Sequence, residues 1–551
     1  MESVGTKMKN TKNAKFKDLV NLFQNLRKQQ IWLLLWCTLS ILLELYFVYL
    51  IQDFVDAIVG KEAMQVILKN FAFISLVGVL AFLTGLYQTY KWHMFRHSLM
   101  NQMYVMMYRK LLKKRATFFD QRATGDIISA VENDGCMIAQ TAGISVLMLV
   151  LNVEQIVVIS AILLYENPVM GCVELLVCGI YFLLINRINK QMRNNYMEFS
   201  QEQANLTQHL NEDVRAVLEI KTLNERPFFE EKYSNHIWQR YFQKAKKIIR
   251  LDVTSYAMNS LISIIFPVFM VLLGGLFLYK NLITIGTVLL FFNYTQKMIE
   301  PLNNLADFYR GSQMAVGSAE RIHEYLFEEE ACGEESLSKY EKPELSINIR
   351  SFAWKDKTIL HNLQETYHGG DKVFIRGESG SGKTTLLKLI CGFYEVGDGQ
   401  ITLCGKDVHT IKEEELFDYI KIQFQEPIIL EGSLRDNIAL GEDYSDKEIF
   451  NTLQMVQLKE FALEKGLNYE IKEAGKNLSG GQKQRLALAR ILIRKPKILI
   501  LDEATNGVDA ENESIITENI KKYVEENDSI LLVTSHKDKL REICNKTLDI
   551  S

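Results

Sequence analysis

The chain has 551 residues, of which 48% are hydrophobic and 24% charged, and its formal net charge is −4. This length is enough for at least two domains, and the balanced charge excludes the basic footprint of a nucleic-acid-binding protein. The eight cysteines show no C-x-x-C pair and no secreted-domain spacing. We therefore expect reduced thiols rather than disulfides or a metal site.

The N-terminal segment, residues 1–30, is polar and basic, and we expect no cleavable signal peptide in it. Residues 16–26 have the pattern of a short amphipathic helix lying on the membrane face, an elbow before the first span; the alternative is a loose tail.

Six apolar stretches follow within residues 31–325, each near the ~20 residues that a helix needs to cross ~30 Å of hydrocarbon. They are residues 31–52, 70–90, 143–165, 169–187, 255–279 and 283–303. The last is the weakest, because Gln296, Lys297 and Glu300 interrupt its end. The pattern predicts an α-helical membrane domain with six spans.

Charge predicts the orientation of these spans. The N-terminal segment and residues 91–142 are rich in Lys and Arg, which favours the cytoplasmic side of a cell membrane. Six crossings then leave both termini in the cytoplasm. Two long stretches on that side, 91–142 and 188–254, keep a helical pattern and would extend the bundle beyond the bilayer.

Three acidic residues, Glu44, Glu154 and Glu174, lie inside the apolar stretches. Acidic groups are costly in hydrocarbon, so they usually face a cavity or a partner. Either they recognise a cation or an amine in the cargo, or they make structural contacts between helices.

The pattern changes near residue 326. Residues 326–344 are acidic and polar, as in a linker, and from Leu345 onward strand-like and helix-like segments alternate. Residues 345–551 therefore predict an α/β nucleotide-binding domain.

This domain contains the sequence G-x-x-x-x-G-K-[ST] between an apolar run, 373–375, and a helical segment, 385–390. Its residues are Gly377, Glu378, Ser379, Gly380, Ser381, Gly382, Lys383 and Thr384. Such a loop points backbone N–H groups at a phosphate chain, and the helix N-terminus adds positive potential. Lys383 can reach the β- and γ-phosphates of ATP, and the Thr384 hydroxyl can hold Mg²⁺.

Two further motifs accompany the loop. An apolar strand ends in Asp502 and Glu503, which suits a Mg²⁺ contact and a general base that polarises the attacking water. A second glycine-rich anion site, Ser479, Gly480, Gly481 and Gln482, precedes a helix. One γ-phosphate does not need two such sites from one domain, which favours two domains facing each other.

The order of phosphate loop, Gln425, LSGGQ, Asp502-Glu503 and His536 resembles that of an ATP-binding cassette transporter. Six spans ahead of the cassette resemble an exporter-type half-transporter. The resemblance implies that Trp354 stacks on adenine, that Gln425 senses Mg²⁺, and that His536 contacts the γ-phosphate.

The resemblance also implies that Glu473 and Asp509 act across the domain interface. Residues Asn506-Gly507-Val508 depart from the usual Ser-Ala-Leu beside Asp509. The resemblance therefore supports hydrolysis but not the usual signalling between sites. The chain ends at Ser551, so we expect trimmed closing strands. Coupling helices are implied near 118–134 and 215–225.

The implied mechanism is ATP-driven alternating access. ATP would bind Trp354 and Gly377 to Thr385 of one cassette and Ser479 to Gln482 of the other, and Glu503 would catalyse hydrolysis. The partner is a second half-transporter, identical or different. The alternatives are an ATP-gated channel or regulatory subunit, and an importer; six spans exclude a soluble cassette ATPase.

Overall fold

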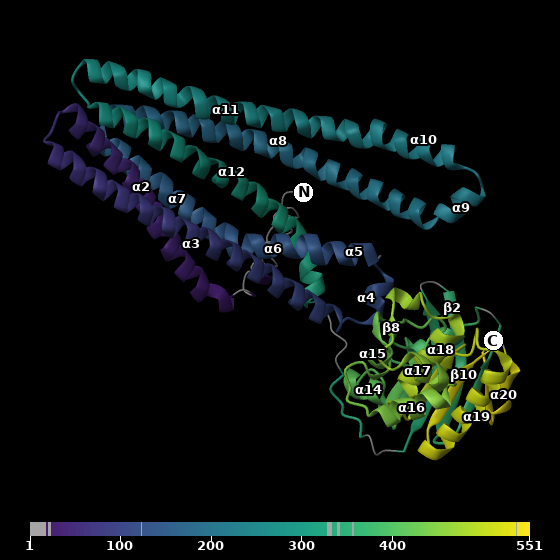
Figure 1. Ribbon diagram of the computed structural model, residues 1–551. Helices are drawn as coiled ribbons and strands as arrows, with labels where there is room; N and C mark the ends of the chain where they lie inside the picture. Colours follow the sequence, from purple (N-terminus) through teal and green to yellow (C-terminus); the bar gives the residue numbers. More distant parts are fainter. Residues whose placement is uncertain are drawn as a thin grey trace. The chain divides into compact units, whose positions relative to one another are not determined.

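The structure is a computed structural model that describes residues 18, 19, 22, 24–122, 124–327, 333–338, 342–354, 357–378, 380–535 and 537–550. The chain forms two compact units. The first comprises Met1–Leu112 and Thr124–Glu328, and the second comprises Lys113–Ala123 and Glu329–Ser551. Figure 1 shows that the first unit is made of long helices and that the second combines strands with shorter helices.

The first unit is entirely helical in its described part. Its α-helices are α2 (Arg27–Val59), α3 (Met64–Leu111), α5 (Thr124–Ser129), α6 (Cys136–Gln140), α7 (Val146–Glu166), α8 (Pro168–Arg215), α9 (Val217–Thr222), α10 (Arg226–His236), α11 (Phe242–Tyr279) and α12 (Ile285–Phe327). Short π-helical segments cover Ala130–Gly135, Thr141–Ser145 and Ile237–Tyr241. The end of the predicted helix 16–26 is a 3₁₀ turn, Gln24–Leu26, that leads into α2. Most of the rest of that predicted helix lies outside the described residues.

Five helical segments in the described part of the chain are long and apolar enough to cross a membrane. They are Arg27–Val59, Met64–Leu111, Thr124–Glu166, Pro168–Met192 and Arg226–Tyr279. The sixth predicted span, 283–303, falls in α12, which packs against α2, α7, α8 and α11. Its polar residues lower its hydropathy, so the count of six spans is approximate.

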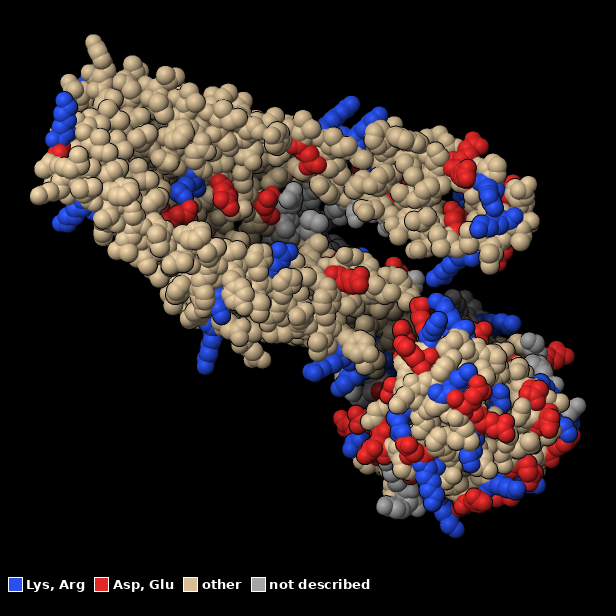
Figure 2. All heavy atoms as spheres, in the orientation of Figure 1, with Lys and Arg blue, Asp and Glu red and all other residues tan. Residues whose placement is uncertain are grey.

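The core of the first unit is built where α12 meets its neighbours. Leu163, Met170, Met270, Phe291 and Tyr294 are essentially inaccessible to solvent. In contrast, large apolar side chains of α3 are exposed along its length, as a lipid-facing helix requires. On the face shown in Figure 2, charged residues are dense on the second unit and sparse over much of the first.

The three membrane acids have specific helical partners. Glu44 of α2 forms an ion pair with Lys297 of α12, and Glu154 of α7 accepts a hydrogen bond of 2.8 Å from Thr38. Glu174 of α8 is fully buried and accepts a hydrogen bond of 2.9 Å from the Thr295 hydroxyl. These contacts favour the structural alternative for Glu174, because its carboxylate lies inside the helix packing.

The second unit contains two larger sheets. An antiparallel sheet has the order β2 (Lys357–His368), β1 (Glu344–Trp354), β4 (Asp398–Leu403) and β5 (Lys406–Asp407). A parallel sheet has the order β11 (Lys546–Asp549), β3 (Lys372–Arg376), β10 (Ile530–Thr534), β9 (Ile498–Asp502) and β6 (Ile420–Gln423). A small pair joins β7 (Gly432–Ser433) to β8 (Glu470–Ile471).

Helices complete this unit. They are α4 (Ala116–Asp120), α13 (Lys383–Ile390), α14 (Glu413–Tyr419), α15 (Leu434–Ala439), α16 (Asp446–Met455), α17 (Lys459–Lys465), α18 (Gly480–Leu492), α19 (Ala510–Asn527) and α20 (Asp538–Glu542). Every residue of β9 and β10 is buried, as expected for parallel strands covered on both faces. Because these strands run in register, Asp502 and Thr534 lie side by side at their carboxyl ends.

Asp56 provides a testable contact between two helices of the first unit. Its carboxylate accepts hydrogen bonds from the Gly286 backbone N–H (2.8 Å) and the Thr284 hydroxyl (2.6 Å), where α12 begins. We expect Asp56→Ala to destabilise the unit by ~1 kcal/mol, because helix N-terminal donors lose their acceptor. Thermal unfolding in detergent should show a lower melting temperature, whereas Glu62→Ala, in the exposed turn after α2, should leave it unchanged.

Candidate nucleotide site

The phosphate loop connects the buried strand β3 to helix α13. Two of its glycines have positive φ, +83° at Gly380 and +100° at Gly382, which side chains rarely adopt. A Cβ at position 382 would lie 2.5 Å from Cγ2 of Ile359. The loop therefore requires glycine at 382 for both its backbone conformation and its packing, and this shape turns backbone N–H groups inward.

Two side chains of the loop are placed for a phosphate. The Lys383 ammonium donates hydrogen bonds of 2.8 Å to the carbonyls of Gly377 and Glu378, which leaves it one further donor. The Ser381 hydroxyl is buried and has no hydrogen-bond partner among the described residues. A phosphate oxygen would satisfy both groups. Ser379 lies outside the described residues.

The carboxylates of Asp502, the last residue of β9, and of Glu503, the next residue, have different surroundings. Asp502 is 4% exposed and accepts hydrogen bonds from the hydroxyls of Thr384 (2.9 Å) and Thr534 (2.5 Å). Glu503 has a positive φ of +50°, and its backbone N–H donates to the Thr534 carbonyl at 3.0 Å. Its side chain accepts a hydrogen bond of 2.8 Å from the Gln425 amide. The structure thus brings Thr384, Gln425, Asp502 and Glu503 together.

The second glycine-rich motif begins α18. Ser479 caps this helix: its hydroxyl accepts from the Gln482 N–H (3.2 Å), and its own N–H donates to the Gln482 side chain (2.8 Å). The hydroxyl hydrogen of Ser479 remains available for an anion. A Cβ at Gly481 would lie 2.6 Å from the Gly507 carbonyl oxygen, whereas one at Gly480 would meet no atom within 4 Å.

A buried pair of glutamines joins α18 to the end of strand β6 and to Gln425, just beyond it. Gln423, at the end of β6, donates a hydrogen bond of 2.7 Å to the Gln484 side chain of α18. Gln484 in turn donates to the Gln425 backbone carbonyl at 2.7 Å. The backbone beside Gln425 is therefore linked to the helix that carries LSGGQ. Sequence reasoning missed both residues, because an isolated glutamine carries no motif.

Trp354, the expected adenine platform, ends β1 and is partly exposed. Its ring packs edge-on against Tyr394, with centroids 4.8 Å apart. Tyr394 was not predicted as a site residue, and it lies just beyond the phosphate-loop helix. Its hydroxyl donates a hydrogen bond of 2.6 Å to Asp120 of α4. Burial, together with this carboxylate, raises the pKa of Tyr394.

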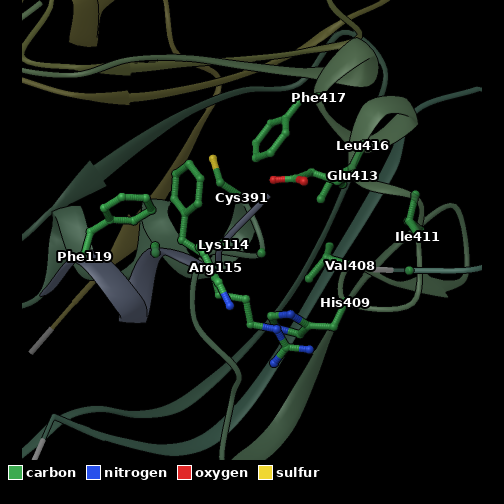
Figure 3. A pocket seen from close by; sticks show the side chains of 14 residues that line it. Lys114, Arg115, Phe119, Cys391, Val408, His409, Ile411, Glu413, Leu416 and Phe417 are labelled. Carbon is green, nitrogen blue, oxygen red and sulfur yellow. The ribbon is translucent and has the colours of Figure 1, made fainter. Parts of the chain in front are cut away.

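Segment 113–123, which the sequence places in the membrane domain, thus packs within the second unit. Arg115 forms an ion pair with Glu395, next to Tyr394. A cavity of about 240 Å³ lies beside this contact, and Figure 3 shows Phe119, His409 and Glu413 among the residues around it. The predicted coupling segment 118–134 is therefore divided, because its first residues belong to this unit and those from 124 onward to the other. The segment predicted at 215–225 contains α9, in the first unit.

The remaining predicted residues lie near domain surfaces or outside the described residues. Asp509 caps α19, and hydrogen bonds from the Asn512 side chain and backbone lower its pKa. The exposed carboxylate of Glu473 pairs with Lys476 at 2.7 Å, which lowers its pKa. Thr385 lies in the first turn of α13. His536 is outside the described residues.

A phosphate loop, a buried aspartate and an adjacent glutamate define a P-loop ATPase domain, here fused to a helical membrane unit. Two family models match the chain: ABC transporter transmembrane region over residues 31–302 and ABC transporter over residues 360–506. The chain belongs to the ABC transporters, as an exporter-type half-transporter. The predicted family, fold class and ATP-binding domain are confirmed.

Several proteins of this family are similar to the chain. A putative multidrug export ATP-binding/permease protein of Bacillus subtilis is 25% identical, with 80% of this chain and 78% of the relative covered. An ATP-dependent lipid A-core flippase of Francisella tularensis is 26% identical, with 77% and 71% covered. A bacterial Atm1-family ABC exporter with ATP bound has the same fold, with a TM-score of 0.78, 20% identity, and 96% and 94% of the two chains covered.

The glycine at 382 can be tested directly. We expect Gly382→Ala to weaken ATP binding at least about tenfold, because the left-handed backbone and the contact with Ile359 oppose a Cβ. Titration with a fluorescent ATP analogue measures this change. Gly397→Ala is the matched control, since a Cβ there meets no atom within 4 Å; equal affinity in both variants would contradict the argument.

The Tyr394–Asp120 hydrogen bond can be tested by a double-mutant cycle. Tyr394→Phe and Asp120→Ala should each destabilise the second unit by roughly 1–2 kcal/mol, and the double variant should cost no more than one of them. Thermal unfolding of the full chain measures the effects. Tyr523→Phe, which loses a hydrogen bond to the Pro496 carbonyl, should instead be additive with Asp120→Ala.

Proposed function

We propose that the chain exports a small molecule, peptide or lipid across the cell membrane by ATP-driven alternating access, as a dimer of half-transporters. The observation that carries the proposal is the catalytic cluster at the carboxyl end of β9. There the Thr384 hydroxyl donates a hydrogen bond of 2.9 Å to the Asp502 carboxylate, and the Gln425 amide donates one of 2.8 Å to the Glu503 carboxylate. A family member without this cluster would lack the means to hydrolyse ATP.

The dimer is supported by two glycine-rich segments that each lead into a helix N-terminus in one chain, those of α13 and α18, because such ends suit anions. One nucleotide does not require both, whereas two cassettes facing each other can place the phosphate loop of one against LSGGQ of the other. Bound ATP would then stabilise the closed pair of cassettes, and hydrolysis of ATP would allow the two cassettes to separate. Differential affinity for ATP in two states is what drives such a transition.

The residues of the site fit the roles expected in hydrolysis. Glu503 would accept a proton from the attacking water, and His536 would contact the γ-phosphate. Trp354 would stack on the adenine ring. The oxygens of Thr384, Asp502 and Gln425 suit Mg²⁺, which would neutralise phosphate charge when bound.

The proposed membrane location and orientation are supported by the apolar helices and by the distribution of Lys and Arg. The apolar segments of the first unit would cross the bilayer, with both termini and the ATPase domain in the cytoplasm. Two of the relatives are named as a putative multidrug export protein and as a lipid A-core flippase. An apolar or amphipathic cargo is therefore the class to screen first.

The test is ATP hydrolysis by the purified chain in lipid, with Mg²⁺, beside Glu503→Gln. We expect the variant to lose at least about a hundredfold in rate, because the general base is removed, while it still traps ATP. Transport of candidate cargo into inverted vesicles, dependent on ATP, then tests export.

Three outcomes would revise the proposal. A folded but inert wild type that becomes active with a second half-transporter would replace the homodimer with a heterodimer. ATP-dependent ion conductance without cargo movement would favour the alternative of an ATP-gated channel. Equal hydrolysis by the wild type and Glu503→Gln would overturn the assignment of the general base.

A further inference from the structure

The loop after Glu503 departs from the sequence usual in this family, and the structure gives the departure a contact. The Asn506 side-chain amide donates a hydrogen bond of 2.6 Å to Oε2 of Glu503. The Gln425 amide donates to the same oxygen at 2.8 Å. Two amides from separate loops therefore meet on one oxygen of the proposed general base.

The backbone around Asn506 is fixed from several sides. The Asn506 N–H donates to the Glu503 carbonyl at 3.1 Å, which closes a turn. The Lys537 ammonium donates to the carbonyls of Thr505 and Val508, both at 3.1 Å. It also pairs at 3.2 Å with Glu513, whose carboxylate is buried and accepts from the Thr505 hydroxyl at 2.7 Å. Asn506 thus projects from a loop with little freedom to move.

We propose that Asn506 is a positioning residue for Glu503, an inference that rests on the proposed hydrolysis of ATP. With both amides on Oε2, the rotation of the Glu503 carboxylate is restrained, and this holds the proposed general base in one orientation. A serine, which is usual at this position, is one heavy atom shorter and carries a single donor. The asparagine adds a second holding contact to the one from Gln425.

The same loop connects Glu503 to the LSGGQ motif. The Gly507 carbonyl packs so closely on Gly481 that a Cβ there would approach it to 2.6 Å. The loop that carries Asn506 therefore packs directly on LSGGQ. In the proposed dimer LSGGQ faces the nucleotide of the partner subunit.

The experiment compares ATP hydrolysis by the full-length chain in lipid for three substitutions. Asn506→Asp keeps the shape but loses the donor, Asn506→Leu loses the donor without adding charge, and Asn506→Ser retains a hydroxyl donor. We expect kcat to fall about tenfold in the first two, the value of one hydrogen bond to a charged group, with KM for ATP unchanged. The serine variant, which keeps one hydroxyl donor on a shorter side chain, should have a kcat between those of the leucine variant and the wild type.

The control is Asn527→Asp, the same change at the far end of α19, where the amide donates to a backbone carbonyl. It should leave kcat unchanged. ATP trapping in a Glu503→Gln background should be retained in every Asn506 variant, which separates a positioning defect from misfolding. Values of kcat within twofold of the wild type for both Asp and Leu would overturn the inference, as would a loss confined to KM. The wild-type rate tests the proposed function, and the ratio of variant to wild type tests Asn506.

Discussion

The nucleotide site depends on one buried carboxylate, that of Asp502. It accepts hydrogen bonds from Thr384 at the start of α13 and from Thr534 at the end of β10, so α13, β9 and β10 meet at one carboxylate. A buried carboxylate is costly unless donors surround it. The parallel register of β9 and β10 supplies one donor at a fixed distance, and the phosphate loop supplies the other. Glu503 follows directly, so its position is set by the same anchor.

Segment 113–123 belongs to the second unit, although both of its ends continue into the helical unit. The chain passes from the first unit into segment 113–123, returns at residue 124, and leaves again near residue 328. Within the second unit, α4 is held by the Tyr394–Asp120 hydrogen bond and by the pair of Arg115 with Glu395. Tyr394 also touches the proposed adenine platform. Tyr394 therefore contacts both the proposed adenine platform and a segment whose two ends continue covalently into the helical unit.

The sequence predicted the parts that local pattern determines, and missed those that depend on three-dimensional contact. The phosphate loop, LSGGQ and the Asp502-Glu503 strand end follow from glycine spacing and apolar runs, and the structure places them as strand, loop and helix. The contact of Asn506 with Glu503 needed a turn geometry that no pattern encodes. The Tyr394–Asp120 bond joins residues 274 positions apart. Its two members carry no motif, so only folding reveals the pair.

Polar contacts join α12 to its neighbouring helices. Tyr181 of α8 donates to Asn303 (2.5 Å) and, at 3.2 Å, to Asn259 of α11, while Asn304 donates to Asn152 of α7 (3.1 Å). In hydrocarbon such groups are tolerated when neighbouring helices satisfy them. Polar residues of α12 thus bind it to α7, α8 and α11. A helix at the centre of a bundle can cross a membrane with fewer apolar residues than a lipid-facing one such as α3.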